Sequence, residues 1–167
     1  MRRIGLAATA AAAVLLLATP SSAAPDRSVT LSRGTRTASW HSGFLVGTNL
    51  GFAPLYALTR CLDWPFSCDD TLIRLTGPGD LTVTVAGPAT GPDADFILQG
   101  FDLFLFRSDA AGTTGAGLTT TRSRGSGSAH AASYTANRLR AGHYLAQVWR
   151  SEGVADYNGT AVFKPTK

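Results

Sequence analysis

Short runs in which apolar and polar residues alternate are the feature that most constrains the fold of this chain. In LTVTVAGP (81–88), three aliphatic residues alternate with two threonines before a Gly-Pro pair. A period of two is typical of a β-strand with one buried face. Similar runs occupy 141–149 and 157–163, and weaker ones lie at 29–33, 43–47, 71–75 and 132–136. Turn residues separate these runs, and no convincing amphipathic helix follows residue 23, so the sequence predicts an all-β sandwich or barrel.

The run GFDLFLFRSDAAG (100–112) is apolar on both of its faces, apart from one aspartate near its start. We expect Leu103 and Leu105 to face the core between two sheets. Phe104 and Phe106 are then expected to face outward, beneath a loop or a neighbouring segment. Asp102 lies at the head of this strand, where a carboxylate commonly accepts backbone N–H bonds from an adjacent turn.

The first 23 residues have the composition of a secretory signal peptide. Arg2 and Arg3 precede an apolar stretch over 4–18, and small residues surround Ala23, after which we expect cleavage. The apolar stretch is about 15 residues long, which is short of the ~20 needed to span a bilayer. We therefore expect an exported, extracellular protein with no membrane span in its mature form.

Removal of residues 1–23 leaves a chain long enough for one hydrophobic core. We expect 24–60 to be an N-terminal segment with one or two strands, folding as one unit with 61–167. Within these parts, 50–60 is a strand or a short helix, and 112–131 is a long surface loop. The leader carries two arginines and no acid, so the formal net charge falls from +4 to +2, which does not indicate a nucleic-acid partner.

Cys61 and Cys68 are the only cysteines of the chain. In an exported protein, two cysteines at this spacing favour one disulfide. A zinc site is the alternative, but it would need two further soft or imidazole ligands nearby. His41, His130 and His143 do not have a matching spacing.

Five motifs, taken in order, resemble the pre-peptidase C-terminal domain of bacterial secreted proteins. They are Asp69-Asp70 before TLIRL, Gly79-Asp80 before LTVTV, FDLFLFRSDAAG, AGHYLAQVW, and YNGTAVF with its leading tyrosine. The resemblance covers about 68–163. It implies an antiparallel β-sandwich of jelly-roll type, related to the collagen-binding domains of clostridial collagenases, some of which bind calcium.

Calcium is the cofactor that this resemblance suggests. Asp69 and Asp70 match the acidic position of the family, and Asp102 is the third candidate ligand. Asp93 and Asp95 would add oxygens if their loop folds back. Calcium takes six to eight oxygen ligands, and the spacing here fits no closed calcium-binding motif. Turn and backbone hydrogen bonding is the structural alternative for these aspartates.

No motif for catalysis is present. A hydrolase needs a nucleophile beside a base, and neither a G-x-S-x-G elbow nor another arrangement of this kind occurs. Trp64 and Phe66, in the loop between the cysteines, are the candidate ligand-binding residues, because a disulfide would hold them as a rigid apolar tip. Trp149 ends a strand, and a packing role is favoured for it.

The sequence therefore predicts a secreted, non-catalytic β-sandwich with one disulfide that serves as a binding module for a protein or polysaccharide surface outside the cell. Two alternatives stay open at this point. One is an accessory or inhibitory partner of a separate secreted protease, and the other is a small secreted hydrolase whose site has no recognisable motif.

Overall fold

The computed structural model of the chain describes residues 25–46, 61, 68–87, 101–114, 122–124, 131–150 and 154–166. Several predictions fall outside these residues: the signal peptide 1–23, the segment 50–60, Trp64, Phe66, Asp93 and Asp95. Within the described ranges every named element is a strand, and no helix is long and apolar enough to cross a membrane.

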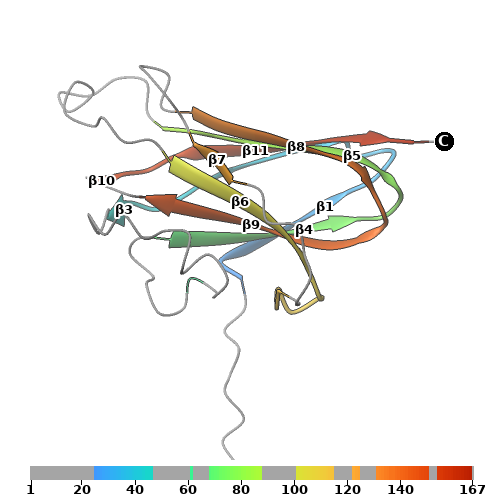
Figure 1. Cartoon of the computed structure of the whole chain (residues 1–167), viewed down its shortest axis with the longest axis horizontal. Coiled ribbons are helices and arrows are strands. Elements are labelled where there is room, and N and C mark those ends of the chain that lie inside the picture. Colours follow the sequence, from blue (N-terminus) through green and yellow to red (C-terminus); the bar gives the residue numbers. More distant parts are fainter. Residues whose placement is uncertain are drawn as a thin grey trace, which may run out of the picture.

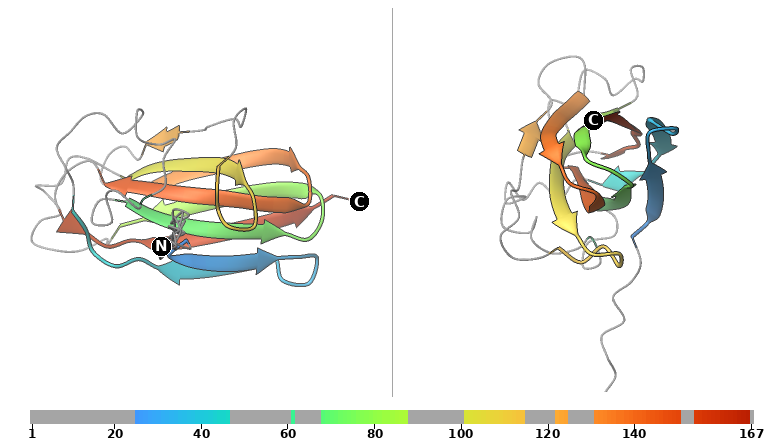
Figure 2. Two further views of the ribbon diagram at one scale, coloured as in Figure 1. Left: turned by 90° about the horizontal axis from the view of Figure 1, so that it is seen from below. Right: turned by 90° about the vertical axis from the view of Figure 1, so that its right-hand side faces the viewer.

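Two sheets pack face to face (Figure 1). The five-stranded sheet has the order β1 (Arg27–Leu31), β4 (Cys68–Leu75), β9 (Gly142–Arg150), β6 (Phe101–Ser108) and β7 (Arg122–Arg124). The four-stranded sheet has the order β2 (Thr37–His41), β11 (Asn158–Pro165), β5 (Gly79–Ala86) and β8 (Ala131–Leu139). A small ladder joins β3 (Leu45–Val46) to β10 (Val154–Ala155). Figure 2 shows the layers from two further directions.

The four-stranded sheet is antiparallel throughout, whereas the five-stranded sheet is mixed. β1 runs parallel to β4, with Arg27 beside Thr71 and Leu31 beside Leu75. The β4–β9, β9–β6 and β6–β7 pairs are antiparallel. The prediction of an all-β sandwich is thus confirmed, with the parallel pairing of β1 as a difference, and the jelly-roll connectivity stays a prediction.

Alternation along the strands forms the core between the sheets, as the sequence predicts. Leu81, Val83 and Val85 of β5 are fully buried there, and Leu103 and Leu105 of β6 face them from the other sheet. The inward residues of β9 are Tyr144, Ala146 and Val148. Each of these strands therefore directs one side chain in every two into this core, at a gain of about 1.5–3 kcal/mol per large aliphatic residue.

Over β6 and β9 the outward face of the five-stranded sheet is buried as well, which explains why 100–112 is apolar on both faces. Phe104 and Phe106 lie with their rings stacked 6.2 Å apart. They belong to a second apolar cluster, called here the outer cluster, made of Cys61, Cys68, Phe104, Phe106, Leu145 and Trp149. The prediction that both phenylalanines lie beneath a neighbouring segment is confirmed, because Cys61 is part of this cluster.

Three details differ from the sequence prediction. The segment 24–60 was expected to hold one or two strands, and its described part holds three, β1, β2 and β3. The predicted loop 112–131 contains β7, which pairs with residues 102–104 of β6. β2 is a five-residue strand that the pattern did not single out, and it pairs with β11. Both are edge strands, and a short or largely polar edge strand has a weak hydrophobic pattern.

Candidate functional site

The two neighbouring aspartates of β4 point to opposite sides of the five-stranded sheet. Asp69 lies beside Val148 of β9, an inward residue, and Asp70 lies beside Gln147. Successive side chains of a strand alternate in direction, so Asp69 enters the space between the sheets and Asp70 the outer face. Both are buried, with exposed fractions of 5% and 2%.

Asp102 shares the outer face with Asp70 but lies two strands away. It is opposite Trp149, whereas Asp70 and Phe104 both flank Gln147. Two strand spacings amount to about 9.5 Å, before the two-residue offset along the strands is added. The predicted grouping of Asp69, Asp70 and Asp102 therefore does not form, and we propose no calcium site from these residues.

Asp69 accepts two hydrogen bonds inside the sandwich. Nη1 of Arg27 and the hydroxyl of Tyr157 both donate to its Oδ2, and Arg27 also donates to Thr71 Oγ1 at 3.3 Å. Nε1 of Trp40 donates to the Tyr157 hydroxyl at 3.4 Å. The resulting chain of contacts, called here the interior network, runs from the edge strand β1 to β2 of the opposite sheet.

The electrostatics of the interior network follow from its burial. Desolvation raises the pKa of the Asp69 carboxyl, and the hydrogen bonds from Arg27 and Tyr157 oppose this rise without cancelling it. Burial also raises the pKa of Tyr157, and the negative charge of Asp69 adds to the rise. Burial acts to lower the pKa of Arg27, but the contact with Asp69 outweighs it and the net change is upward. Tyr157 therefore stays protonated and donates to Asp69, and the network links the two sheets.

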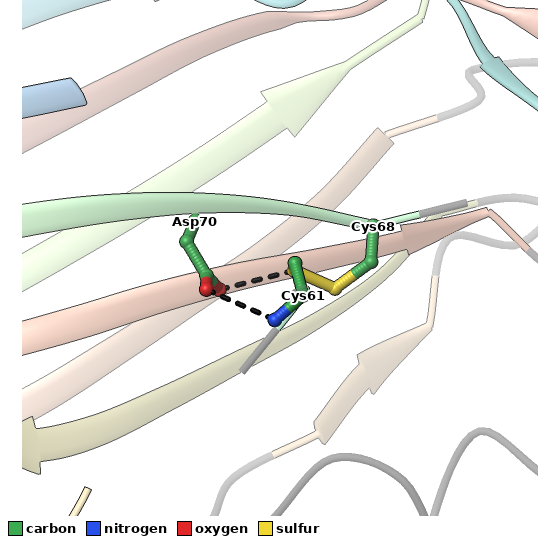
Figure 3. Close-up of side chains that lie close together, drawn as sticks. All are labelled: Cys61, Cys68 and Asp70. Atoms are coloured by element: carbon green, nitrogen blue, oxygen red, sulfur yellow. Dashed lines mark hydrogen bonds between the residues drawn. A yellow bond between two sulfur atoms is a disulfide. The ribbon is translucent and has the colours of Figure 1, made fainter. Parts of the chain in front are cut away.

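Cys61 and Cys68 form a disulfide, which confirms the sequence prediction (Figure 3). Their Cα atoms are 5.2 Å apart, and both residues are buried in the outer cluster. Asp70 lies against this bridge: its Oδ2 accepts the Cys61 backbone N–H at 3.1 Å, and its Oδ1 is 3.1 Å from Cys61 Sγ.

Asp70 is oriented by two further side chains on the same face. Nε2 of Gln147 donates to Asp70 Oδ1 at 3.1 Å, and Nε1 of Trp149 donates to Gln147 Oε1 at 2.7 Å. Trp149 is 5% exposed, so its predicted packing role is confirmed. Within the described part of the chain, Cys61, Cys68 and Asp70 are the one group of three potential metal ligands whose ligand atoms lie within 4.8 Å of one another. In the disulfide state the two sulfur atoms are bonded to each other.

Replacing both cysteines by alanine is expected to lower the free energy of unfolding by about 2–3 kcal/mol, because the bridge closes a short loop and restricts the unfolded chain. Urea unfolding of the variant and of the native protein, followed by circular dichroism, measures the difference. Native protein treated with reductant is the control and should show a similar loss. An unchanged midpoint would contradict a stabilising role.

A largely polar patch without charged residues lies on the outward face of the four-stranded sheet, next to the row in which Asp80 is opposite Lys164. Two rows of residues run across its strands in register: Thr37, Val162, Thr82, Thr135, and Ser39, Thr160, Thr84, Ser133. We call these eight residues the hydroxyl face. Thr82 and Thr135 are hydrogen-bonded through their hydroxyls at 2.8 Å, and Thr84 and Ser133 at 2.9 Å. The residues of the edge strands β2 and β8 are exposed, and those of the two central strands are half-buried.

His41 does not have a free ring nitrogen to serve as a general base. Its Nδ1 is 3.1 Å from Asn158 Oδ1, and its Nε2 is 3.3 Å from Asp156 Oδ2. A base that activates a serine needs one nitrogen directed at the hydroxyl. This exposed histidine therefore acts as a cross-strand polar contact at the end of the sheet.

Sequence reasoning missed the hydroxyl face and two members of the interior network, Arg27 and Tyr157. The alternation of Thr82 and Thr84 was visible, but the other three strands of each row come from distant parts of the chain. The leading tyrosine of YNGTAVF was part of the family pattern, and that motif was the available signal for Tyr157.

Comparisons with known proteins give a limited result. No protein-family model matches the chain, and no curated protein matches it in sequence. Among solved structures, the chain is similar to the pre-peptidase C-terminal domain of a collagenase from Bacillus anthracis, with 12% identity over 82% of this chain and 96% of that one and a TM-score of 0.48. This is the family whose motifs the sequence resembles.

Two further solved structures are similar at lower scores. One is a periplasmic inhibitor of g-type lysozyme from Aeromonas hydrophila, with 13% identity, coverage of 83% and 98% of the two chains, and a TM-score of 0.37. The other is a β-glucosidase from Paenibacillus barengoltzii, with 15% identity, coverage of 80% and 11%, and a TM-score of 0.34. With every TM-score below 0.5, membership of the family stays a prediction.

Proposed function

We propose that this protein is an extracellular, non-catalytic β-sandwich module that binds a neutral, hydroxyl-rich polysaccharide surface through its hydroxyl face. The observation that carries the proposal is the charge-free array of threonine and serine side chains across four strands, exposed on the edge strands and half-buried on the central two, with Val162 at its one apolar position. The extracellular location rests on the predicted signal peptide and is supported by the disulfide.

The contrast between the two outward surfaces supports this choice. On the five-stranded sheet the outward residues Phe104, Phe106, Leu145 and Trp149 are buried. On the four-stranded sheet the two rows of the hydroxyl face are exposed or half-buried, polar apart from Val162, and without charge, and the next row along the same face carries Asp80 and Lys164. A surface without charge suits a neutral partner, because electrostatic complementarity would otherwise select a charged one.

The hydroxyl face is organised before any partner binds. Threonine is stiff about χ1, the strands fix its Cβ positions, and hydroxyl pairs already join β5 to β8. Little side-chain entropy is then lost on binding. Each neutral hydrogen bond contributes about 0.5–1.5 kcal/mol net, so several in parallel are needed for a useful affinity. An extended, repetitive ligand meets that requirement.

Two observations favour a module without catalysis. Both ring nitrogens of His41 are engaged with Asn158 and Asp156. Asp69 and Asp70, the acidic pair of β4, point to opposite faces and are held by Arg27 and Gln147 respectively. Neither arrangement has the nucleophile–base geometry of a hydrolase.

Thr84→Lys is expected to weaken binding about tenfold, because a charge at the centre of the hydroxyl face would lose its hydration against a neutral partner. Depletion of the protein from solution by insoluble cellulose and by insoluble chitin measures the affinity. Thr30→Lys is the matched control, since Thr30 is an exposed threonine on a strand of the other sheet. The proposal fails if the native protein binds neither solid, or if both variants lose binding equally.

A further inference from the structure

We propose that, when the disulfide is reduced, Cys61, Cys68 and Asp70 form a binding site for a thiophilic divalent cation such as Zn²⁺ or Cd²⁺. Disulfide formation and metal binding are then two exclusive states of one site. This inference is independent of the proposed function, because it concerns the outer face of the five-stranded sheet.

The positions of the three donor groups suit such an ion. Their ligand atoms all lie within 4.8 Å of one another, and Asp70 Oδ1 is already 3.1 Å from Cys61 Sγ. A tetrahedral site with metal–ligand distances of about 2.0–2.3 Å has its ligand atoms roughly 3.3–3.8 Å apart. Breaking the S–S bond lets the sulfur atoms separate to this distance by side-chain rotation, while their Cα atoms stay near 5.2 Å. Figure 3 shows the carboxylate directed at the bridge.

Residues around the donor set hold Asp70 in place, as they do in known metal sites. Gln147 donates to Asp70 Oδ1, Trp149 donates to Gln147, and the Cys61 backbone N–H donates to Asp70 Oδ2. Partners of this kind orient a ligating carboxylate and raise metal affinity. These contacts fix the orientation of the Asp70 carboxylate before the ion binds.

The chemistry of the donors selects the ion. Two thiolates with one carboxylate favour zinc or cadmium over calcium, which requires oxygen ligands. The two states interconvert in a balanced way. An added phosphine reductant supplies two electrons, two protons enter from water, and the disulfide becomes two thiols. The cation then displaces both thiol protons and forms two metal–sulfur bonds, with a fourth position left for water.

Burial strengthens the case for a cation in the reduced state. Cys61, Cys68 and Asp70 are 6%, 2% and 2% exposed. Without a cation, two thiolates and a carboxylate would be three uncompensated negative charges in a poorly hydrated space. A divalent ion removes that obstacle, so metal binding and thiol deprotonation are coupled.

The test is a titration of the phosphine-reduced protein with Cd²⁺, followed by the ultraviolet sulfur-to-cadmium charge-transfer band and by the thermal midpoint. We expect one equivalent to bind and the midpoint to rise, since the ion binds the folded state. Asp70→Asn should bind about tenfold more weakly or worse. Asp80→Asn, whose amide oxygen can still accept the Arg138 N–H, is the matched control and should bind like the native protein.

Three further measurements of Cd²⁺ binding test the proposal. The oxidised protein should show no charge-transfer band. The reduced native chain in guanidinium carries both thiols but no positioned Asp70, and it should bind Cd²⁺ more weakly than the folded chain. This comparison remains informative even if the Asp70→Asn variant does not fold. If reduction unfolds the protein, added Cd²⁺ should refold it. Equal affinity in the folded and denatured chains, or no band in the reduced folded protein, would overturn the proposal.

Discussion

Arg27→Met is expected to lower the free energy of unfolding by about 3 kcal/mol near pH 7. The substitution removes the cation that contacts the buried Asp69 carboxylate and leaves that charge with the Tyr157 hydroxyl. Removing one partner of a buried pair costs about 3–5 kcal/mol, and the lower end applies because the Arg27 side chain is 22% exposed. Urea unfolding of both proteins measures the loss.

The loss should depend on pH in a defined direction. The folded-state pKa of Asp69 already lies above its ordinary value of 3.8, mainly because of burial. Such a group stabilises the fold below its unfolded pKa, and this contribution is lost as the pH rises through the folded value. Arg27→Met raises the folded pKa further, so its deficit should be larger near pH 7 than near pH 3. Arg33→Met, at an exposed arginine, is the control, and a pH-independent deficit would contradict a role for the Asp69 charge.

Gly159→Ala should cost about 3 kcal/mol, the second large effect. Gly159 of β11 lies directly opposite Trp40 of β2. A Cβ at this position would overlap three atoms of the indole ring, Cε2, Nε1 and Cζ2, the farthest of them at 2.5 Å. The ring cannot move away without giving up its hydrogen bond to the Tyr157 hydroxyl. Thermal and urea unfolding measure the change.

A second-site variant and a control separate this clash from a general glycine effect. Gly77→Ala should change the midpoint little, because no atom lies within 4 Å of a Cβ added there. Trp40→Leu combined with Gly159→Ala should lose less than the sum of the two single losses, since the smaller side chain leaves room for the methyl group. Additive losses would show that the ring and the glycine do not interact.

Alternation within single strands was readable from the sequence. The pattern of β5 predicted which of its residues enter the core, and that of β6 predicted two buried faces, with leucines on one and phenylalanines on the other. The disulfide was also predictable, because the compartment and the short spacing of Cys61 and Cys68 left few alternatives. These inferences need only local periodicity and composition.

The candidate sites depend on contacts between distant segments, which local patterns do not contain. Arg27 and Asp69 are 42 residues apart, and Tyr157 and Asp69 are 88 residues apart. The separation of Asp69 from Asp70 was available in principle, since consecutive residues of one strand face opposite ways. The parallel pairing of β1 with β4 was not predictable, because the pattern of a five-residue edge strand does not indicate which strand it pairs with.

The placement of β9 and β11 has a consequence for how the molecule is made. β9 lies between β4 and β6, and β11 lies between β2 and β5, so each layer receives a central strand from the last quarter of the polypeptide. A ribosome releases the amino end first, and during most of synthesis the earlier strands lack the neighbours they need. The five-stranded layer cannot close until β9 has emerged, and the four-stranded layer cannot close until residues near 165 have emerged.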